Sequence, residues 1–445
     1  MLWIVLGAYT LLLIAIAIRS RKHSSADEFL MSNRSANSVQ VAAGLFTLIG
    51  GGELVALASL GFLFGWSGIA LFVGYAAGFV FLGVMAPKIR AESHEHHFVS
   101  LPDYVHFHFG LGPGLLTYVF SFLAFFALLM LQFSAAGAVV SPFLGVPESF
   151  VVVGVGIAVL VYLLVGGFRA VLITDVVQGV AMFVILPTLV YLVANSDPMK
   201  IEYSGAEGSL PAALWSSLVF SGFFVAAASA DVWQRAYAAK THRTAKLGFF
   251  IGGVSFLVFG FVIVAIGMIA RSLGVAGPDL AFVEVLVNHL PDSVSALVAL
   301  LVLCAMMSTA DTETFLLTGL TQHELRRLVP NSSISYWVDS VTGVRVLMAT
   351  IALASMGFAY FFNNLVGIYT WLLSALVVVS PIVLFSLFRK ASDVGMFVAM
   401  LANSILFVAL LIADVITLDN LYLIALPGAV FYIFALILKP RHTGA

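Results

Sequence analysis

The chain consists of long apolar runs separated by short polar stretches. The first run, Leu2–Ile18, holds no charged residue. A helix of about 20 apolar residues crosses the hydrocarbon core of a bilayer, so runs of this kind predict transmembrane helices. Only 9% of the 445 residues are charged, whereas soluble domains carry about 25%. The runs lack the alternation of a membrane β-barrel. We therefore expect an all-α polytopic membrane protein.

The apolar runs predict about thirteen transmembrane helices, and the basic residues predict their orientation. If the N-terminus is outside and the C-terminus is cytoplasmic, only Lys200 and Arg271 of the 20 lysine and arginine residues lie outside. Adding or removing one crossing would scramble this pattern, so the charges also support the number of helices. The expected helices cover residues 2–18, 38–64, 67–87, 114–141, 147–165, 168–194, 211–231, 246–272, 293–322, 338–362, 365–388, 394–415 and 420–438.

Glu53 lies in the second expected helix, directly after Gly50, Gly51 and Gly52. Each glycine costs a helix about 1 kcal/mol relative to alanine, which favours unwinding at this run. In transporters, an unwound segment frees carbonyls for a cation and amides for an anionic group. Close helix packing through small residues is the alternative. We favour unwinding because an acid inside a membrane usually marks a functional site.

Ser308, Thr309 and Asp311 form a polar patch in the ninth expected helix. An aspartate at the centre of a bilayer costs about 2.5–3.5 kcal/mol, so such a residue usually faces a partner, water or an ion. Ser308, Asp311 and Thr312 have the i, i+3, i+4 spacing of one helix face. Oxygen ligands of this kind suit a hard cation. Hydrogen bonding between helices would explain the hydroxyls, but it does not explain why Glu313 follows Asp311 so closely.

Two further acids stand at the ends of expected helices. Asp175 opens the sixth helix, where Thr174 and Gln178 share one face. Its alternative role is to stabilise the helix start through the helix dipole. Asp231 ends the seventh helix, where it is either a pocket residue or a charge at the membrane interface.

Other classes of function find little support in the sequence. The net charge of −2 gives no reason to expect nucleic-acid binding. Histidines at positions 94, 96, 97, 106 and 108 fall in one expected loop, where solvation is a better interpretation than a metal site. No Ser-His-Asp or Cys-His arrangement can be placed at one membrane depth, so we do not expect an enzyme.

Four stretches resemble the sodium:solute symporter family, which includes sodium/proline, sodium/galactose and sodium/sialic acid transporters. Gly166–Gln178 (GGFRAVLITDVVQ) resembles the family signature, and Ser100–Tyr104 (SLPDY) resembles the loop after the third helix. Asp231–Arg235 (DVWQR), with Ala238–Lys240 (AAK), resembles the loop after the seventh helix. Ala305–Asp311 (AMMSTAD) resembles the sodium-binding helix. Their order and spacing agree with the family over essentially the whole chain.

The resemblance implies a LeuT-like fold, in which one leading helix precedes two inverted five-helix repeats and two helices follow. In this chain, residues 1–34 would form the leading part and residues 35–194 and 209–390 the repeats. Residues 391–445 would hold the two additional helices, and the whole would be one transporter domain. Substrate and ion sites in such folds lie near the membrane midplane, on broken helices. The glycine run falls where the first repeat is expected to break, and helix seven is its counterpart.

The resemblance also implies a sodium site between the first helix of one repeat and the third helix of the other. Its ligands would be backbone carbonyls and two hydroxyls, from Ala305, Ser308, Thr309, Phe46 and Ile49. Some members bind a second sodium beside the signature aspartate, which is Asp175 here. Asp311 and Gln178 are expected to support the site without touching the ion.

The solute pocket is expected beside the sodium site. Family members that bind sugars or proline carry a polar residue shortly before the glycine region, where this chain has only Thr47. The carboxyl group of Glu53 would instead favour a solute with an amine, or supply a proton site. The candidate pocket residues are Gly50, Gly51, Gly52, Glu53, Asp231 and Tyr369.

The expected function is therefore a sodium-coupled symporter that imports a small organic solute through the cell (inner or plasma) membrane. Sodium is the expected cofactor, and the lipid bilayer and the solute are the expected partners. Two alternatives remain open. One is proton coupling through Glu53, Asp175 or Asp311, which the paired hydroxyls argue against because a proton needs no such cage. The other is a transporter-like membrane sensor.

Overall fold

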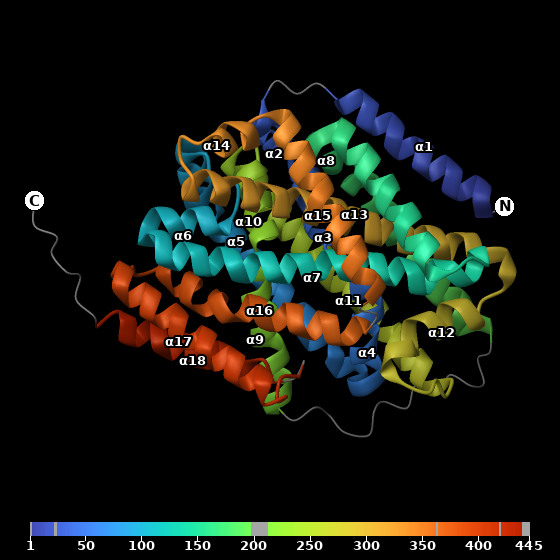
Figure 1. Cartoon of the computed structure of the whole chain (residues 1–445). Coiled ribbons are helices and arrows are strands. Elements are labelled where there is room, and N and C mark those ends of the chain that lie inside the picture. The colour runs from blue at the N-terminus through green and yellow to red at the C-terminus, as the bar shows by residue number, and fades with distance from the viewer. Residues whose placement is uncertain (1, 22–24, 197–211, 362–363, 418–419, 438–445) are drawn as a thin grey trace, which may run out of the picture.

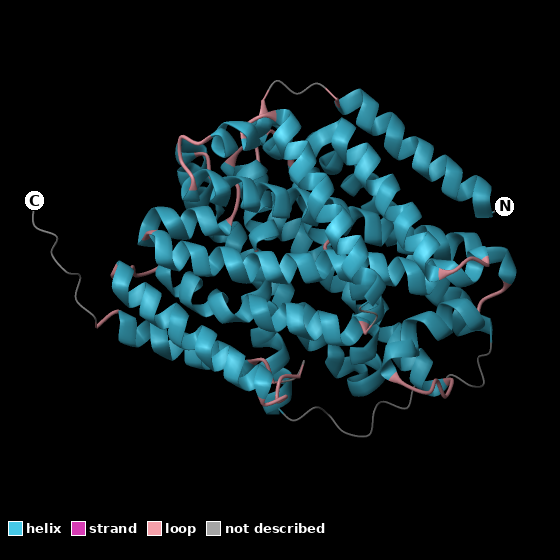
Figure 2. Ribbon diagram, in the orientation of Figure 1, coloured by secondary structure: helices cyan, strands magenta, loops and turns pink. Residues whose placement is uncertain are grey.

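The structure is a computed structural model that describes residues 2–21, 25–196, 212–361, 364–417 and 420–437. Helices make up almost all of these residues, and the ribbon shows them packed lengthwise into one body (Figure 2). Within the described part, eight helices are long and apolar enough to cross a membrane, or nine if one bent pair is a single span. The all-α expectation is therefore confirmed, while the number thirteen and the orientation of the termini stay predictions.

The helices follow the expected apolar runs closely. The first part of the chain forms α1 (Leu2–Ser20), α2 (Ala26–Met31), α3 (Ser38–Phe46), α4 (Gly51–Phe64), α5 (Ala70–His96), α6 (Leu101–Phe109), α7 (Leu111–Leu144) and α8 (Glu148–Ser196). The second part forms α9 (Ala212–Ala228), α10 (Ala230–Ala238), α11 (His242–Ser272), α12 (Ala281–Asn288), α13 (Ser295–Leu328), α14 (Ser333–Val338), α15 (Val341–Phe361), α16 (Leu365–Ser386), α17 (Asp393–Ile412) and α18 (Tyr422–Ala435). Short 3-10 turns cover Ser32–Arg34, Gly65–Ile69, Pro278–Leu280 and Asp292–Val294.

Some boundaries differ from the expected ones. The fifth and sixth expected helices both lie within α8, where two helical stretches meet at a kink between their expected ranges, at Gly167 with φ 63° and ψ −174°. Only glycine adopts this conformation without strain. Some predicted boundaries lie outside the described residues. They are the start of the second repeat at 209, the helix start at 211 and the last helical residues at 362 and 438. Lys22, Lys200, Lys439 and Arg441 also lie outside the described residues.

The second expected helix is broken where α3 ends and α4 begins. Residues 47–49 form a turn and Gly50 is extended, with φ −76° and ψ −178°. A Cβ atom on Gly50 would lie 2.4 Å from Gln132 Oε1, 2.5 Å from Thr309 Oγ1 and 2.6 Å from Glu53 Oε2. Only glycine therefore fits, and three polar side chains meet around its backbone. The break covers residues 47–50 and includes only the first residue of the glycine run, because Gly51 and Gly52 already form the first turn of α4.

A second break separates α9 from α10. Ser229 is extended between them, and the two helices meet at an angle of 47°. The short helix α10 is buried along its whole length and packs against α3, α5 and α13. Asp231 thus lies in the first turn of a buried helix and is itself only 3% exposed. Asp231 is therefore enclosed by protein and is not an exposed charge of the kind found at a membrane interface.

The long helix α13 is enclosed by other helices. It packs against α7, α8 and α15, and its most apolar stretch is 83% buried inside the protein. Figure 1 shows α7 crossing the middle of the molecule, with α1 beside α8 on one flank and α17 and α18 on the other. Polar side chains on α13 therefore face protein rather than lipid, which removes most of the cost of placing them at membrane depth.

Candidate functional site

Four oxygen atoms meet where α13 passes the α3–α4 break. The Thr309 hydroxyl donates to the carbonyls of Thr47 (2.9 Å) and Ala305 (3.2 Å). The Ser308 hydroxyl lies 2.9 Å from the Ala305 carbonyl and 3.4 Å from the Thr47 carbonyl. A hydroxyl group can rotate to turn a lone pair toward a cation. Carbonyls freed at a broken helix and hydroxyl oxygens are the groups with which such transporters coordinate sodium.

The carbonyls of Phe46 and Ile49 were the expected ligands on this segment. In the structure the carbonyl of Thr47, which lies between them, meets the two hydroxyls. The Phe46 carbonyl accepts a hydrogen bond from the Ile49 amide (3.3 Å), and the Phe46 ring packs against Phe183 and Phe259. Ile49 is fully buried. The carbonyl that meets Ser308 and Thr309 is that of Thr47, which the sequence marked only as the single polar residue before the glycines. Its direction depends on local backbone angles that no residue pattern reports.

Asp175 pairs with an arginine. Its carboxylate lies 2.9 Å from Arg235 Nη2, and both side chains are fully buried. The same guanidinium donates to the Thr312 hydroxyl (2.6 Å) and lies over the Phe168 ring at 5.5 Å. Asp175 therefore already has a cationic partner. No sequence pattern indicates this pair, because Asp175 and Arg235 lie on separate helices.

Asp311 and Gln178 make contacts with the scaffold helices. Asp311 accepts hydrogen bonds from the hydroxyls of Tyr162 (2.6 Å) and Thr174 (3.4 Å) on α8. Gln178 donates to the Tyr9 hydroxyl on α1 (2.6 Å). These bonds join α13, α8 and α1 beside the oxygen cluster, which is compatible with the supporting role expected of both residues.

The candidate pocket residues Glu53, Asp231 and Tyr369 line one small internal cavity of about 40 Å³. Gln132 bridges this cavity to the break, because its amide donates to Glu53 Oε2 (2.9 Å) and its oxygen accepts from the Gly52 amide (3.2 Å). Asp231 accepts from the hydroxyl of Ser229 and from the Val232 amide. The two breaks thus each place one carboxyl group at the same cavity.

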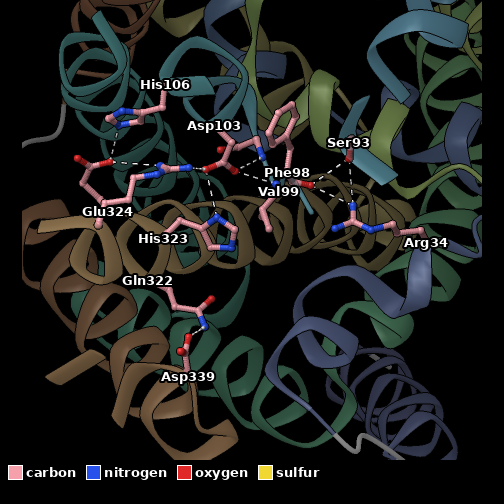
Figure 3. A network of polar contacts seen from close by, with 12 residues as sticks. Arg34, Ser93, Phe98, Val99, Asp103, His106, Gln322, His323, Glu324 and Asp339 are labelled. Atoms are coloured by element: carbon pink, nitrogen blue, oxygen red, sulfur yellow. Dashed lines mark hydrogen bonds and ion pairs between the residues drawn. The ribbon is translucent and has the colours of Figure 1, made fainter. Parts of the chain in front are cut away.

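A separate polar network joins α6 to the end of α13 (Figure 3). Asp103 pairs with Arg327 and with His323 (3.1 Å), and it accepts from the amides of Val99 (2.8 Å) and Ser100 (3.1 Å). In the same network, His106 lies 3.0 Å from Glu324. Arg34 donates to the Phe98 carbonyl (3.0 Å) and to Ser93 (3.2 Å).

Comparisons with known proteins show the family and the fold of the chain. The sequence pattern of the sodium:solute symporter family matches residues 29–403. The chain belongs to the sodium:solute symporter family. It is accordingly a multi-pass membrane protein, and its relatives are transporters rather than enzymes.

Two curated relatives of this symporter-family chain are each 26% identical to it over part of their length. One is the spermidine transporter DUR31 of Candida albicans, aligned over 237 residues, 51% of this chain and 44% of the relative. The other is high-affinity choline transporter 1 of Caenorhabditis elegans, aligned over 267 residues, 57% of this chain and 45% of the relative. The chain thus aligns with a little under half the length of each.

Solved structures show the fold. A sodium-coupled sialic acid symporter, substrate-bound and outward-open, matches with a TM-score of 0.80 and 13% identity over 98% of each chain. Mhp1, a nucleobase-cation-symport-1 family transporter in a closed conformation, matches with a TM-score of 0.60 and 15% identity, over 94% of this chain and 96% of its own. The symporter-family chain therefore has the fold of LeuT-type transporters, as its sequence motifs led us to expect.

The basic side chains around Asp103 lower the pKa of its carboxyl group. Burial by itself raises the pKa of the Asp103 carboxyl group, but His323 and Arg327 outweigh burial, and the net pKa lies well below its usual range. A carboxyl group whose pKa is lowered by folding stabilises the folded state at every pH above its unfolded pKa, about 3.9. This contribution is lost only as the pH falls below that value.

Replacing Asp103 with alanine is expected to lower the free energy of unfolding by about 3 kcal/mol, because two backbone amides and Arg327 lose their acceptor. Asp103→Asn keeps one acceptor oxygen and should cost less. Its deficit relative to the wild type should narrow below about pH 4, because there the Asp103 carboxylate of the unfolded wild type takes up protons while that of the folded state stays ionised. Thermal unfolding of the purified protein measures both effects. The exposed Asp279→Ala is the control, and equal stability of Asp103→Ala and Asp279→Ala would contradict the assignment.

Proposed function

We propose that this protein is a sodium-coupled symporter that imports a small organic solute by alternating access. The observation that carries the proposal is the cluster of the Thr47 and Ala305 carbonyls with the Ser308 and Thr309 hydroxyls. All four oxygens are neutral and buried. Sodium is a hard cation, and oxygen ligands of this kind suit it.

Coupling follows from the position of Gly50 between the ion site and the cavity. Thr309 Oγ1 of the oxygen cluster and Glu53 Oε2 of the cavity would both meet a Cβ atom placed on Gly50. A cation that draws Thr309 and the Thr47 carbonyl together would therefore fix the backbone from which Glu53 projects. Sodium and solute then strengthen each other's binding by the same factor, because linkage is reciprocal.

Alternating access requires groups of helices to move relative to each other, and the two helix breaks lie at the site around which they move. In transporters built from inverted repeats, one bundle rocks against the rest of the protein around a fixed midplane site. We assign residues 35–194 and 209–390 to the two repeats, with the N-terminus outside. The rocking bundle consists of the second, third, seventh and eighth expected helices. One sodium ion moving across 100 mV yields about 2.3 kcal/mol, and a tenfold gradient adds about 1.4 kcal/mol. Together they sustain accumulation of roughly several hundredfold.

The experiment that tests coupling is solute uptake into proteoliposomes at fixed pH, with and without a sodium gradient. Choline and spermidine are the first solutes to try, because two relatives are named for them, followed by amino acids, sugars and carboxylates. Uptake that requires sodium supports the proposal. Uptake driven by a pH gradient without sodium would replace it by proton coupling. Solute binding without any transport would favour a sensor.

A further inference from the structure

The internal cavity between the two breaks combines carboxyl groups with aromatic rings. Glu53 and Asp231 line it together with Tyr75, Phe256 and Tyr369. These residues come from α4, α10, α5, α11 and α16, so the cavity lies at the junction of five helices. If the chain is a symporter as proposed above, this cavity is where the solute binds. We propose that it binds a small organic cation that carries a protonated amine or a quaternary ammonium group.

The first argument is the balance of charge. Glu53 bonds to the amide of Gln132, and Asp231 bonds to Ser229 and the Val232 amide. All these partners are neutral. No arginine, lysine or histidine is among the described residues that line the cavity. Two carboxyl groups inside a low-dielectric site without a positive partner are costly, and a cationic ligand offsets that cost.

The nearest arginine offsets these charges only in part. Arg235 stands one turn after Asp231 on α10 and attracts its carboxyl group, but the guanidinium pairs with Asp175 and donates to Thr312. A third acid adds to the imbalance. Glu313 is fully buried and interacts electrostatically with Asp231 and Glu53, and neither of its carboxyl oxygens has a hydrogen-bond partner. The surroundings of the cavity therefore favour positive ligands and repel anions.

The second argument is independent of charge balance and comes from the aromatic wall. The rings of Tyr75 and Phe256 stack with centroids 4.9 Å apart and an interplanar angle of 20°. Phe79 meets the Phe256 ring edge-on at 5.3 Å and holds it in place. An aromatic face attracts a cation through its quadrupole, and aromatic pockets recognise quaternary ammonium groups in this way. The Tyr75 and Phe256 rings line the same cavity as the two carboxyl groups.

The size of the cavity fits a closed form of the site. A volume of about 40 Å³ holds about one water molecule, so an organic cation needs a wider conformation. The Tyr75 and Tyr369 hydroxyls lie 3.5 Å apart, and these residues belong to α5 and α16. Separation of these two side chains would enlarge the cavity and leave the Tyr75 ring available to the bound cation.

The test uses the purified full-length protein in sodium buffer, with thermal unfolding as the measure of binding. The probes are methylammonium, choline and spermidine, and the matched neutral probe is 3,3-dimethyl-1-butanol, the uncharged carbon isostere of choline. At least one cation should raise the unfolding midpoint. Choline should do so at concentrations where its isostere has no effect. No stabilisation by any of the three cations, or equal stabilisation by choline and its isostere, would overturn the proposal.

Variants locate the effect. Asp231→Asn should weaken binding of the cation at least tenfold, while the exposed Asp279→Asn should leave it unchanged. Asp231 is preferred to Glu53 because Glu53 also borders the oxygen cluster. If Asp231→Asn does not fold, Glu53→Gln takes its place. Unchanged cation binding in the folded variant would overturn the assignment to this cavity.

Sodium dependence separates this proposal from the proposed function. Cation binding that is the same with potassium in place of sodium would overturn sodium coupling and support the cation site. Conversely, sodium-dependent stabilisation by a sugar or a carboxylate, with none by the cations, would support sodium coupling and overturn the cation site.

Discussion

Replacing Thr309 with alanine is expected to raise the sodium concentration for half-maximal solute uptake at least tenfold. The substitution removes one of the four oxygens of the cluster, the hydroxyl that lies closer to the Thr47 carbonyl, at 2.9 Å against 3.4 Å for Ser308. A tenfold loss corresponds to about 1.4 kcal/mol, near the lower end of what hydrogen bonds to charged groups contribute. Alanine is a good helix former, so α13 itself should persist. Uptake measured over a sodium titration at fixed pH gives the result.

Two variants sharpen this test. Thr309→Ser keeps the hydroxyl and should retain most of the sodium affinity. Thr318→Ala is the matched control, because Thr318 lies on the same buried helix and its hydroxyl bonds to the Thr314 carbonyl within that helix (2.6 Å). Sodium dependence that is unchanged in both Thr309→Ala and Ser308→Ala would exclude the cluster as the ion site.

The sequence predicted which helices carry the site better than it predicted where their backbone groups point. Hydroxyls at 308 and 309 inside an apolar run could be recognised because polar groups at membrane depth need a reason. The Thr47 carbonyl that meets these hydroxyls could not be recognised, since its direction is set by the turn at residues 47–49. Gly167 lies between the two helices that the sequence predicts at 147–165 and 168–194. Its positive φ makes a kink between two helical stretches of α8 at that position.

The ion pair between Asp175 and Arg235 could not be predicted from the sequence. Asp175 was recognised as an unusual acid, and Arg235 as part of a family-like stretch. Nothing in either segment indicates that they meet, because each stands on its own helix and the contact depends on how three helices pack. A Cβ atom on Gly44 of α3 would lie 2.5 Å from Arg235 Nε, so the guanidinium reaches Asp175 through a gap that only glycine leaves.

This pair changes the hypothesis of a second sodium ion beside Asp175. A carboxylate that pairs with a guanidinium at 2.9 Å is already neutralised, and a sodium ion would have to displace the arginine or share the carboxylate with it. We therefore expect coupling to one sodium ion, bound at the cluster of Thr309. A Hill coefficient near one for the sodium dependence of uptake would agree with this expectation.

Replacing Arg235 with methionine is expected to lower the free energy of unfolding by about 3–5 kcal/mol. Methionine preserves much of the side-chain volume, so the loss comes mainly from leaving the Asp175 carboxylate buried without its cation. The Thr312 hydroxyl also loses the donor that bonds to it at 2.6 Å. Thermal unfolding of the purified protein, together with the yield of folded protein from membranes, measures the effect. Arg169→Met, at an exposed position on α8, is the control and should have little effect.

The double variant Arg235→Met with Asp175→Asn decides whether the ion pair is the cause. Removing both charges leaves no unpaired ion, and replacing a whole buried pair with neutral groups is often nearly neutral for stability. The double variant should therefore be more stable than Arg235→Met alone, a coupling that double-mutant cycles detect between residues in contact. If the two losses simply add, Arg235 stabilises the fold through packing against Gly44 and Phe168, and Asp175 becomes available again as a ligand for a second sodium ion.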